Sequence, residues 1–119
     1  MSTLETQSAL DQRAALDQRA ALFAALGDGT RLGLIAKLSG SQPQSISRLA
    51  EGTALTRQAI TKHLKVLEGA GIVRGIKSGR ENLFEFQAQP LRELERYLDT
   101  VARQWEDTLG RLKAFVEQG

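Results

Sequence analysis

A pair of short helical segments separated by a tight turn constrains the fold of this chain most strongly. Ser45 is a typical helix N-cap, and the apolar residues behind it predict a short helix over residues 46–51. Residues 52–55 supply a turn with a glycine, and Thr56 begins a second helix that reaches roughly residue 68. Two helices joined by about four residues form a helix-turn-helix, which we assign to residues 45–69.

The pattern changes to strands once Gly69 and Gly71 have ended the second helix. Short apolar runs at 72–76 and 83–86 flank a polar loop that contains Gly79, which can adopt the positive φ of a tight turn. We therefore predict a β-hairpin over residues 72–87. Because its loop is polar and basic, we expect it to project from the domain as a wing.

Long helices are predicted at both ends of the chain. The first covers residues 1–26, with the strongest helix-forming composition from Ala9 to Leu26, and Gly27 ends it. Asp28 can cap a further helix over residues 30–38, in which Leu32, Ile35 and Leu38 recur at helical spacing. The last helix covers residues 90–118, and its apolar residues follow one another at intervals of three or four.

The apolar stripe of the last helix spans about seven turns, more than one small domain covers. A second copy of the chain would bury it, so we predict a homodimer joined through the first and last helices. The expected interface residues are Leu16, Phe23, Leu98, Val101, Trp105, Leu109 and Leu112. A small-ligand pocket between the two helices, near Phe23 and Trp105, is an alternative role for this region.

The expected fold is one domain, residues 1–119, mainly α with a small β-hairpin: a winged helix-turn-helix with long terminal helices at a dimer interface. Apolar residues make up 41% and charged residues 25%, as in soluble globular proteins. The chain has no apolar run of membrane-spanning length, no secretory signal and no cysteine, so a cytoplasmic location fits best. With one histidine and no cysteine we expect no enzyme, no metal site and no cofactor.

The basic residues are concentrated in one block. Between Thr56 and Arg80 there are six basic residues and one acidic residue, a local charge of +5, whereas the whole chain carries +2. The remainder is therefore negative, at −3. A local basic surface attracts polyanions whatever the total charge, which favours double-stranded DNA as the partner.

The second helix of the helix-turn-helix has two different faces. Ile60, Leu64 and Leu67 share one face and predict the buried side. The opposite arc carries an amide, a hydroxyl and ammonium groups, which pair with base edges and phosphates in a DNA groove. The predicted DNA-binding residues of this helix are Thr56, Arg57, Gln58, Thr61, Lys62, His63 and Lys65. His63 lies near the buried face, so it either packs in the domain or donates to a phosphate.

On the hairpin, Lys77 and Arg80 complete the predicted DNA-binding set. Arg80 follows Gly79 at the tip and can enter a narrow minor groove, while Lys77 and Arg74 neutralise phosphates further back. Two alternatives without a DNA-binding role remain open: the polar face of the second helix and the charged tip of the hairpin can each serve solvation alone, as such surfaces do in many proteins. A different function is also open, namely a winged-helix module that docks an acidic protein and binds no operator.

The residues resemble the ArsR-type winged helix-turn-helix repressors. The stretch LFAALGDGTR at 22–31 is similar to the family's opening motif, LTRQAITKHLKVLEGAGIV at 55–73 to its recognition helix, and Gly79-Arg80 to its wing. The resemblance implies a homodimer that binds an imperfect palindromic operator, with half-sites about one helical turn apart, and represses its own or a neighbouring operon.

Two departures from the family pattern bear on regulation. Gly29 stands where many relatives have proline, before Thr30 and Arg31. Ser45 and Ser47 align with the family's Cys-x-Cys metal motif, so the resemblance is to a metal-free branch. We expect no thiolate-based metal sensing. The identity of any small-molecule inducer is not encoded in these motifs.

Overall fold

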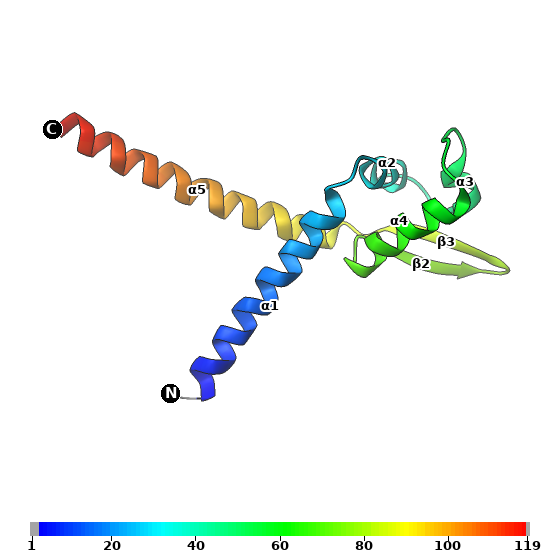
Figure 1. Cartoon of the computed structure of the whole chain (residues 1–119), viewed down its shortest axis with the longest axis horizontal. Coiled ribbons are helices and arrows are strands. Elements are labelled where there is room, and N and C mark those ends of the chain that lie inside the picture. Colours follow the sequence, from blue (N-terminus) through cyan, green and yellow to red (C-terminus); the bar gives the residue numbers. More distant parts are fainter. Residues whose placement is uncertain (1–2, 119) are drawn as a thin grey trace.

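The computed structural model of the chain describes residues 3–118 and confirms a mainly helical fold with a small antiparallel sheet and a long helix at each end (Figure 1). Residues 1 and 2 of the predicted first helix lie outside the described residues. In chain order the elements are α1 (Thr3–Leu26), α2 (Gly29–Leu38), β1 (Gln44–Ser45), α3 (Ile46–Ala50), α4 (Arg57–Gly69), β2 (Val73–Ser78), β3 (Glu81–Phe86) and α5 (Gln89–Gln118).

Three polar side chains fix the starts of the helices around the helix-turn-helix. Each accepts a hydrogen bond from the backbone N–H three residues later, which would otherwise lack a partner. The pairs are Asp28 with Arg31 at 3.0 Å, Ser45 with Arg48 at 3.2 Å, and Thr56 with Ala59 at 3.1 Å. The caps at Asp28 and Ser45 are confirmed as predicted, and the Thr56 cap begins α4 where the sequence placed the start of that helix. The turn between α3 and α4 contains Gly52 at φ +75°, a conformation that glycine adopts without a Cβ clash.

The sheet has the order β1-β3-β2, and all pairs are antiparallel. β2 and β3 pair from Val73 opposite Phe86 to Ser78 opposite Glu81, so only Gly79 and Arg80 form the turn. The strands therefore run further toward the tip than the apolar runs indicated, and the hairpin projects from the domain (Figure 1). β1 was not predicted, because a two-residue strand has no periodicity of its own.

The core lies where the helix-turn-helix packs on α1, α2, the hairpin and the start of α5. Its buried side chains are Leu22, Ala25, Leu34, Leu38, Leu49, Ile60, Leu64, Leu67, Ile72, Val73 and Leu94. α2 forms where it was predicted and buries Leu34 and Leu38, whereas Leu32 is 51% exposed. α2 packs on α4 through the row that contains Leu34 and Leu38, which turns Leu32 outward.

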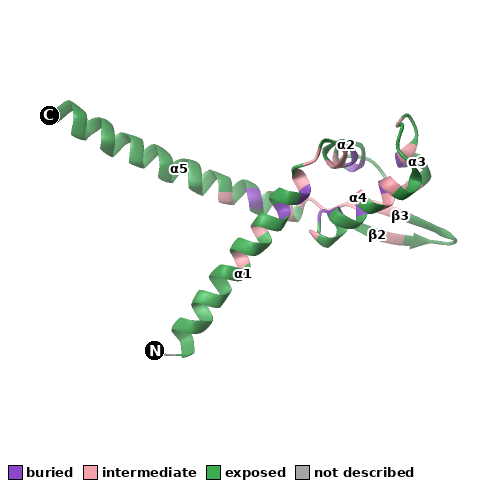
Figure 2. Cartoon of the chain, viewed as in Figure 1, coloured by how far each residue is buried: buried purple, intermediate pink, exposed green. Residues whose placement is uncertain are grey.

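The two terminal helices extend far beyond this core. α1 buries only Leu22 and Ala25 and α5 buries only Leu94, so most of both helices is exposed (Figure 2). The radius of gyration is 20.0 Å, against about 13–14 Å for a compact chain of this length. Trp105 is 61% exposed, and the other large apolar residues of these arms are exposed as well: Leu16, Phe23, Leu98, Val101, Leu109 and Leu112.

No helix within residues 3–118 is both long enough and apolar enough to span a bilayer.

Leu64 anchors α4 in the core and is fully buried, whereas Val66 on the same helix is 45% exposed. We expect Leu64→Ala to lower the free energy of unfolding by about 2–5 kcal/mol, because it removes buried methyl groups and leaves a cavity. Val66→Ala is the matched control and should change it by less than about 1 kcal/mol. Urea denaturation at one fixed protein concentration measures both, and equal losses would contradict this core.

Candidate nucleic-acid interface

α4 is held rigidly by one face and is open to solvent on the other. Ile60, Leu64 and Leu67 are all fully buried, as their spacing predicted. Gln58, Lys62 and Lys65 lie on the exposed side of the same helix. A helix anchored in this way presents its polar side chains at fixed positions, as a helix must to enter a major groove.

Six of the nine predicted DNA-binding side chains have no partner within the described residues. Neither a hydrogen bond nor an ion pair engages the side chains of Arg57, Gln58, Lys62, Lys65, Lys77 and Arg80. Five of the six are cations, and the sixth is an amide that both donates and accepts. Each of these groups is therefore free to contact a phosphate or a base edge.

The two threonines of the predicted set already have structural roles. The Thr56 hydroxyl caps α4, and the Thr61 hydroxyl donates to the Arg57 carbonyl at 2.8 Å. Their oxygen atoms keep acceptor capacity, but the donor of Thr61 is used inside the helix. The sequence pattern could not show this, because back-bonding depends on the side-chain rotamer.

The hairpin and α4 border a common groove of about 340 Å³, into which both Lys65 and Lys77 face as lining residues. Glu68 joins its two walls: its carboxylate accepts the backbone N–H of Gly75 in β2 at 3.2 Å. Arg74 differs from Lys77 in having a partner within the protein: its guanidinium pairs with the Glu85 carboxylate at 2.7 Å across the hairpin, and its side chain is still 62% exposed.

His63 points toward the start of α2. Its Nδ1 lies 3.3 Å from Nη1 of Arg31 and 3.8 Å from the Asp28 carboxylate. Arginine only donates, so Nδ1 accepts, and the proton of the neutral ring sits on Nε2. The sequence allowed His63 either to pack in the domain or to donate to a phosphate. This contact is of the packed kind, and Nε2–H remains available as a donor.

Comparisons with known proteins agree with this geometry. A family model described as a helix-turn-helix domain matches residues 26–76. An ArsR-like transcriptional regulator from Rhodococcus is similar in structure with a TM-score of 0.83, is 34% identical, and the match covers 89% of this chain and 96% of that one. The chain belongs to the ArsR family. It is thus a DNA-binding transcriptional regulator with a winged helix-turn-helix.

Two further relatives of this ArsR-family chain carry informative names. A transcriptional repressor, SmtB of Mycobacterium tuberculosis, is 32% identical over 74% of this chain, which spans 63% of the repressor's length. A homodimeric winged helix-turn-helix domain from Mycobacterium bovis shares the fold with a TM-score of 0.63 at 22% identity, covering 81% of this chain and 88% of that one. These relatives are regulators and not enzymes by name.

The metal motif of the ArsR family does not fit the residues present here. The positions that the family resemblance assigns to its Cys-x-Cys motif hold Ser45 and Ser47, and hydroxyl groups lack the thiolate character that binds zinc-like ions. The Ser45 hydroxyl is moreover used to cap α3. Within residues 3–118, no three or more histidine, aspartate or glutamate side chains gather into a candidate metal site.

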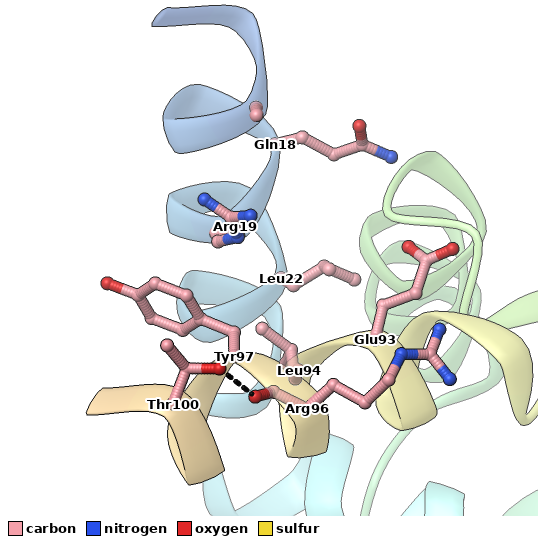
Figure 3. Close-up of a pocket in the computed structure, with 9 residues that line it drawn as sticks. Gln18, Arg19, Leu22, Glu93, Leu94, Arg96, Tyr97 and Thr100 are labelled. Atoms are coloured by element: carbon pink, nitrogen blue, oxygen red, sulfur yellow. Dashed lines mark hydrogen bonds between the residues drawn. The ribbon is translucent and has the colours of Figure 1, made fainter. Parts of the chain in front are cut away.

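A cavity of about 410 Å³ lies between α1 and α5 (Figure 3). Its wall includes Leu22, Leu94 and Tyr97, and the Arg19 guanidinium stacks 4.5 Å from the centre of the Tyr97 ring. The cavity lies between the two helices that the sequence indicated and close to Phe23, but away from Trp105. Phe23 packs edge-on against Tyr97 outside the cavity lining, and Trp105 lies further along α5.

The pKa of Asp28 lies below its ordinary value of 3.8, chiefly because its carboxylate accepts the Arg31 backbone N–H, and the charge of Arg31 acts in the same direction. A carboxylate with a lowered folded-state pKa stabilises the fold above its unfolded pKa, and this contribution is lost as the pH falls through the folded pKa. The Asp28→Asn variant would keep an amide oxygen that can cap α2, but this side chain would not titrate.

We therefore expect the wild type to melt at a higher temperature than Asp28→Asn at pH 7. The gap should narrow as the pH falls below about 5, and close when the Asp28 carboxylate is protonated. Thermal melting of both proteins from about pH 7 to about pH 3 measures it. A gap that stays constant over this range would contradict the ionic role of Asp28.

Proposed function

We propose that this protein is a homodimeric repressor that binds a two-fold symmetric operator of its own or a neighbouring operon. The observation that carries the proposal is the free polar face of α4, held in place by a fully buried opposite face. α4 would lie in the major groove of each half-site, with the hairpin over the adjacent minor groove.

The free side chains divide by the DNA groups that they suit. Arg57 at the N-terminal end of α4 can form bidentate hydrogen bonds with a guanine edge, and Gln58 can do the same with an adenine edge. Lys62, Lys65 and Lys77 provide point charges for phosphates. Arg80 at the hairpin tip suits a narrow minor groove. The shorter side chains of Thr56 and Thr61 and the Nε2–H of His63 would add contacts to the DNA backbone.

Dimerisation would cover the arms that a single chain leaves bare. The exposed stripe of α5 runs from Leu98 to Val116, and α1 adds Leu16 and Phe23. A second copy brings the same stripe, and an isologous contact buries both at once. The Mycobacterium bovis domain, which shares this fold, is homodimeric, and this supports pairing of two copies.

Regulation would not depend on a thiolate-bound metal, because serines replace both cysteines of the family motif. The cavity between α1 and α5 is the place for a small-molecule inducer instead. Its volume of about 410 Å³ falls within the range of ligand pockets, and Leu22, Tyr97 and Arg19 combine apolar and cationic contacts there. A ligand at this place would act on the two helices that build the dimer.

The alternative of a protein-docking module has weaker support from the same surface. Docking faces bury aromatic and aliphatic anchor residues at their centre. The exposed arc of α4 presents Gln58, Thr61, Lys62 and Lys65, none of which is such an anchor. Polar and cationic groups without apolar anchors favour nucleic acid.

The assignment of base contacts and phosphate contacts predicts two kinds of mutant. Using an operator recovered by selection from random duplexes, Arg57→Ala and Gln58→Ala should each cost about 1–3 kcal/mol and relax specificity at particular base pairs. Lys65→Ala and Lys77→Ala should weaken binding to all sequences about equally and reduce the salt slope by about one. Titration against operator variants at several salt concentrations separates them, and equal losses on every sequence for all four variants would refute the assignment.

The dimer interface is tested by a matched pair of charge insertions on α5. Val101→Asp places a carboxylate on the apolar stripe, where pairing with a second copy would bury it without a partner, so we expect a monomer. Ala114→Asp adds the same charge to the opposite side of the helix and should leave the dimer intact. Sedimentation equilibrium measures both. A Val101→Asp variant that stays a tight dimer would place the interface elsewhere.

A further inference from the structure

Arg31 lies where three helices meet, and its guanidinium contacts two of them from the first turn of α2. Nε donates to the Ala25 carbonyl at 2.7 Å, and Nη2 donates to the Ala24 carbonyl at 3.1 Å. Nη1 donates to Nδ1 of His63, on α4, at 3.3 Å. Within residues 3–118, it is the side chain that hydrogen-bonds both α1 and the recognition helix.

The contacts to α1 are made at carbonyls of its last turn. Ala24 and Ala25 belong to the last turn of α1, where the helix dipole is negative; the Ala24 carbonyl also accepts the Gly27 backbone N–H at 3.2 Å, so Arg31 adds a second donor there. A planar guanidinium binds two adjacent carbonyls in a fixed geometry. The end of α1 is therefore held at a defined position relative to Arg31.

The base of Arg31 is fixed as well. The Asp28 carboxylate accepts the Arg31 backbone N–H at 3.0 Å and lies 3.8 Å from Nδ1 of His63. α1 packs chiefly against α2 and α5, whereas α4 packs against α2, α3 and β2. The orientation of α1 relative to α4 therefore depends on the junction at Arg31, because the two helices share no broad direct interface.

We propose that Arg31 is a positioning residue that fixes the angle between the dimer helix α1 and the recognition helix α4. In a dimer, this angle sets the distance between the two recognition helices and so the half-site spacing that the protein accepts. The role rests on the proposed function, because it needs two copies on one duplex. Arg31 itself touches no DNA in this scheme.

Half-site spacing is the readout that separates positioning from simple stabilisation. The test uses the selected operator and a set of duplexes in which the two half-sites are moved apart or together by one and two base pairs. Arg31→Lys keeps the positive charge but loses the planar fork, so it cannot hold both α1 carbonyls and His63 together. Arg48→Lys, on exposed α3, is the matched control with the same exchange.

We expect the wild type and Arg48→Lys to prefer one spacing strongly. Arg31→Lys should remain a folded dimer, but its preference for that spacing over its neighbours should fall by about tenfold. His63→Ala cuts the link at α4 and leaves the α1 clamp. Because it also removes the proposed Nε2–H contact to DNA, its affinity should fall at every spacing, and in addition its preference among spacings should broaden to a similar degree. The double variant should be no broader than either single variant, because both changes break one connection.

Each other result overturns the inference. An Arg31→Lys dimer with unchanged spacing preference would show that the angle is set elsewhere. An equal loss of affinity at every spacing, together with a lower melting temperature, would reduce Arg31 to a structural role. A wild type that binds every half-site spacing equally would contradict the proposed binding of a dimer to two half-sites. The role of Arg31 depends on that binding and would fall with it.

Discussion

The burial of one face of α4 is the constraint on which the rest of this structure depends. Ile60, Leu64 and Leu67 are sealed in the core, and this fixes both the rotation and the depth of the helix. Gln58, Lys62 and Lys65 therefore face outward, and six side chains of α4 and the hairpin remain without partners among the described residues. Because the folding energy and the binding surface come from opposite faces of one helix, the surface is preformed before DNA arrives.

The hydrophobic effect also explains why the chain is unlike a compact domain. α1 and α5 each bury one end in the core and carry exposed apolar residues along the rest, which gives the extended shape of Figure 1. Such arms are costly in water and become favourable when a second copy covers them. Dimer formation and recognition would then share the junction at Asp28, Arg31 and His63, so that a change between the arms reaches the DNA-facing helix.

Local signals in the sequence were sufficient for the elements and for much of the surface. The caps at Asp28, Ser45 and Thr56, the turn at Gly79 and the spacing of Ile60, Leu64 and Leu67 each depend on residues close in the chain. What could not be predicted is set by packing between distant segments. The β1 pairing, the burial of Leu34, the Arg74–Glu85 ion pair and the contact of Arg31 with His63 are of this kind.

The most direct test of the account is to measure binding of the purified protein to its own upstream promoter and to a scrambled duplex of equal composition. Both titrations are run across salt concentrations, with and without a chelator. The account predicts that the promoter binds tighter by about a thousandfold or more, that both affinities fall steeply with salt, and that the chelator changes neither. Weak binding that is equal on the two duplexes at every salt concentration would contradict sequence-specific repression through α4 and the hairpin.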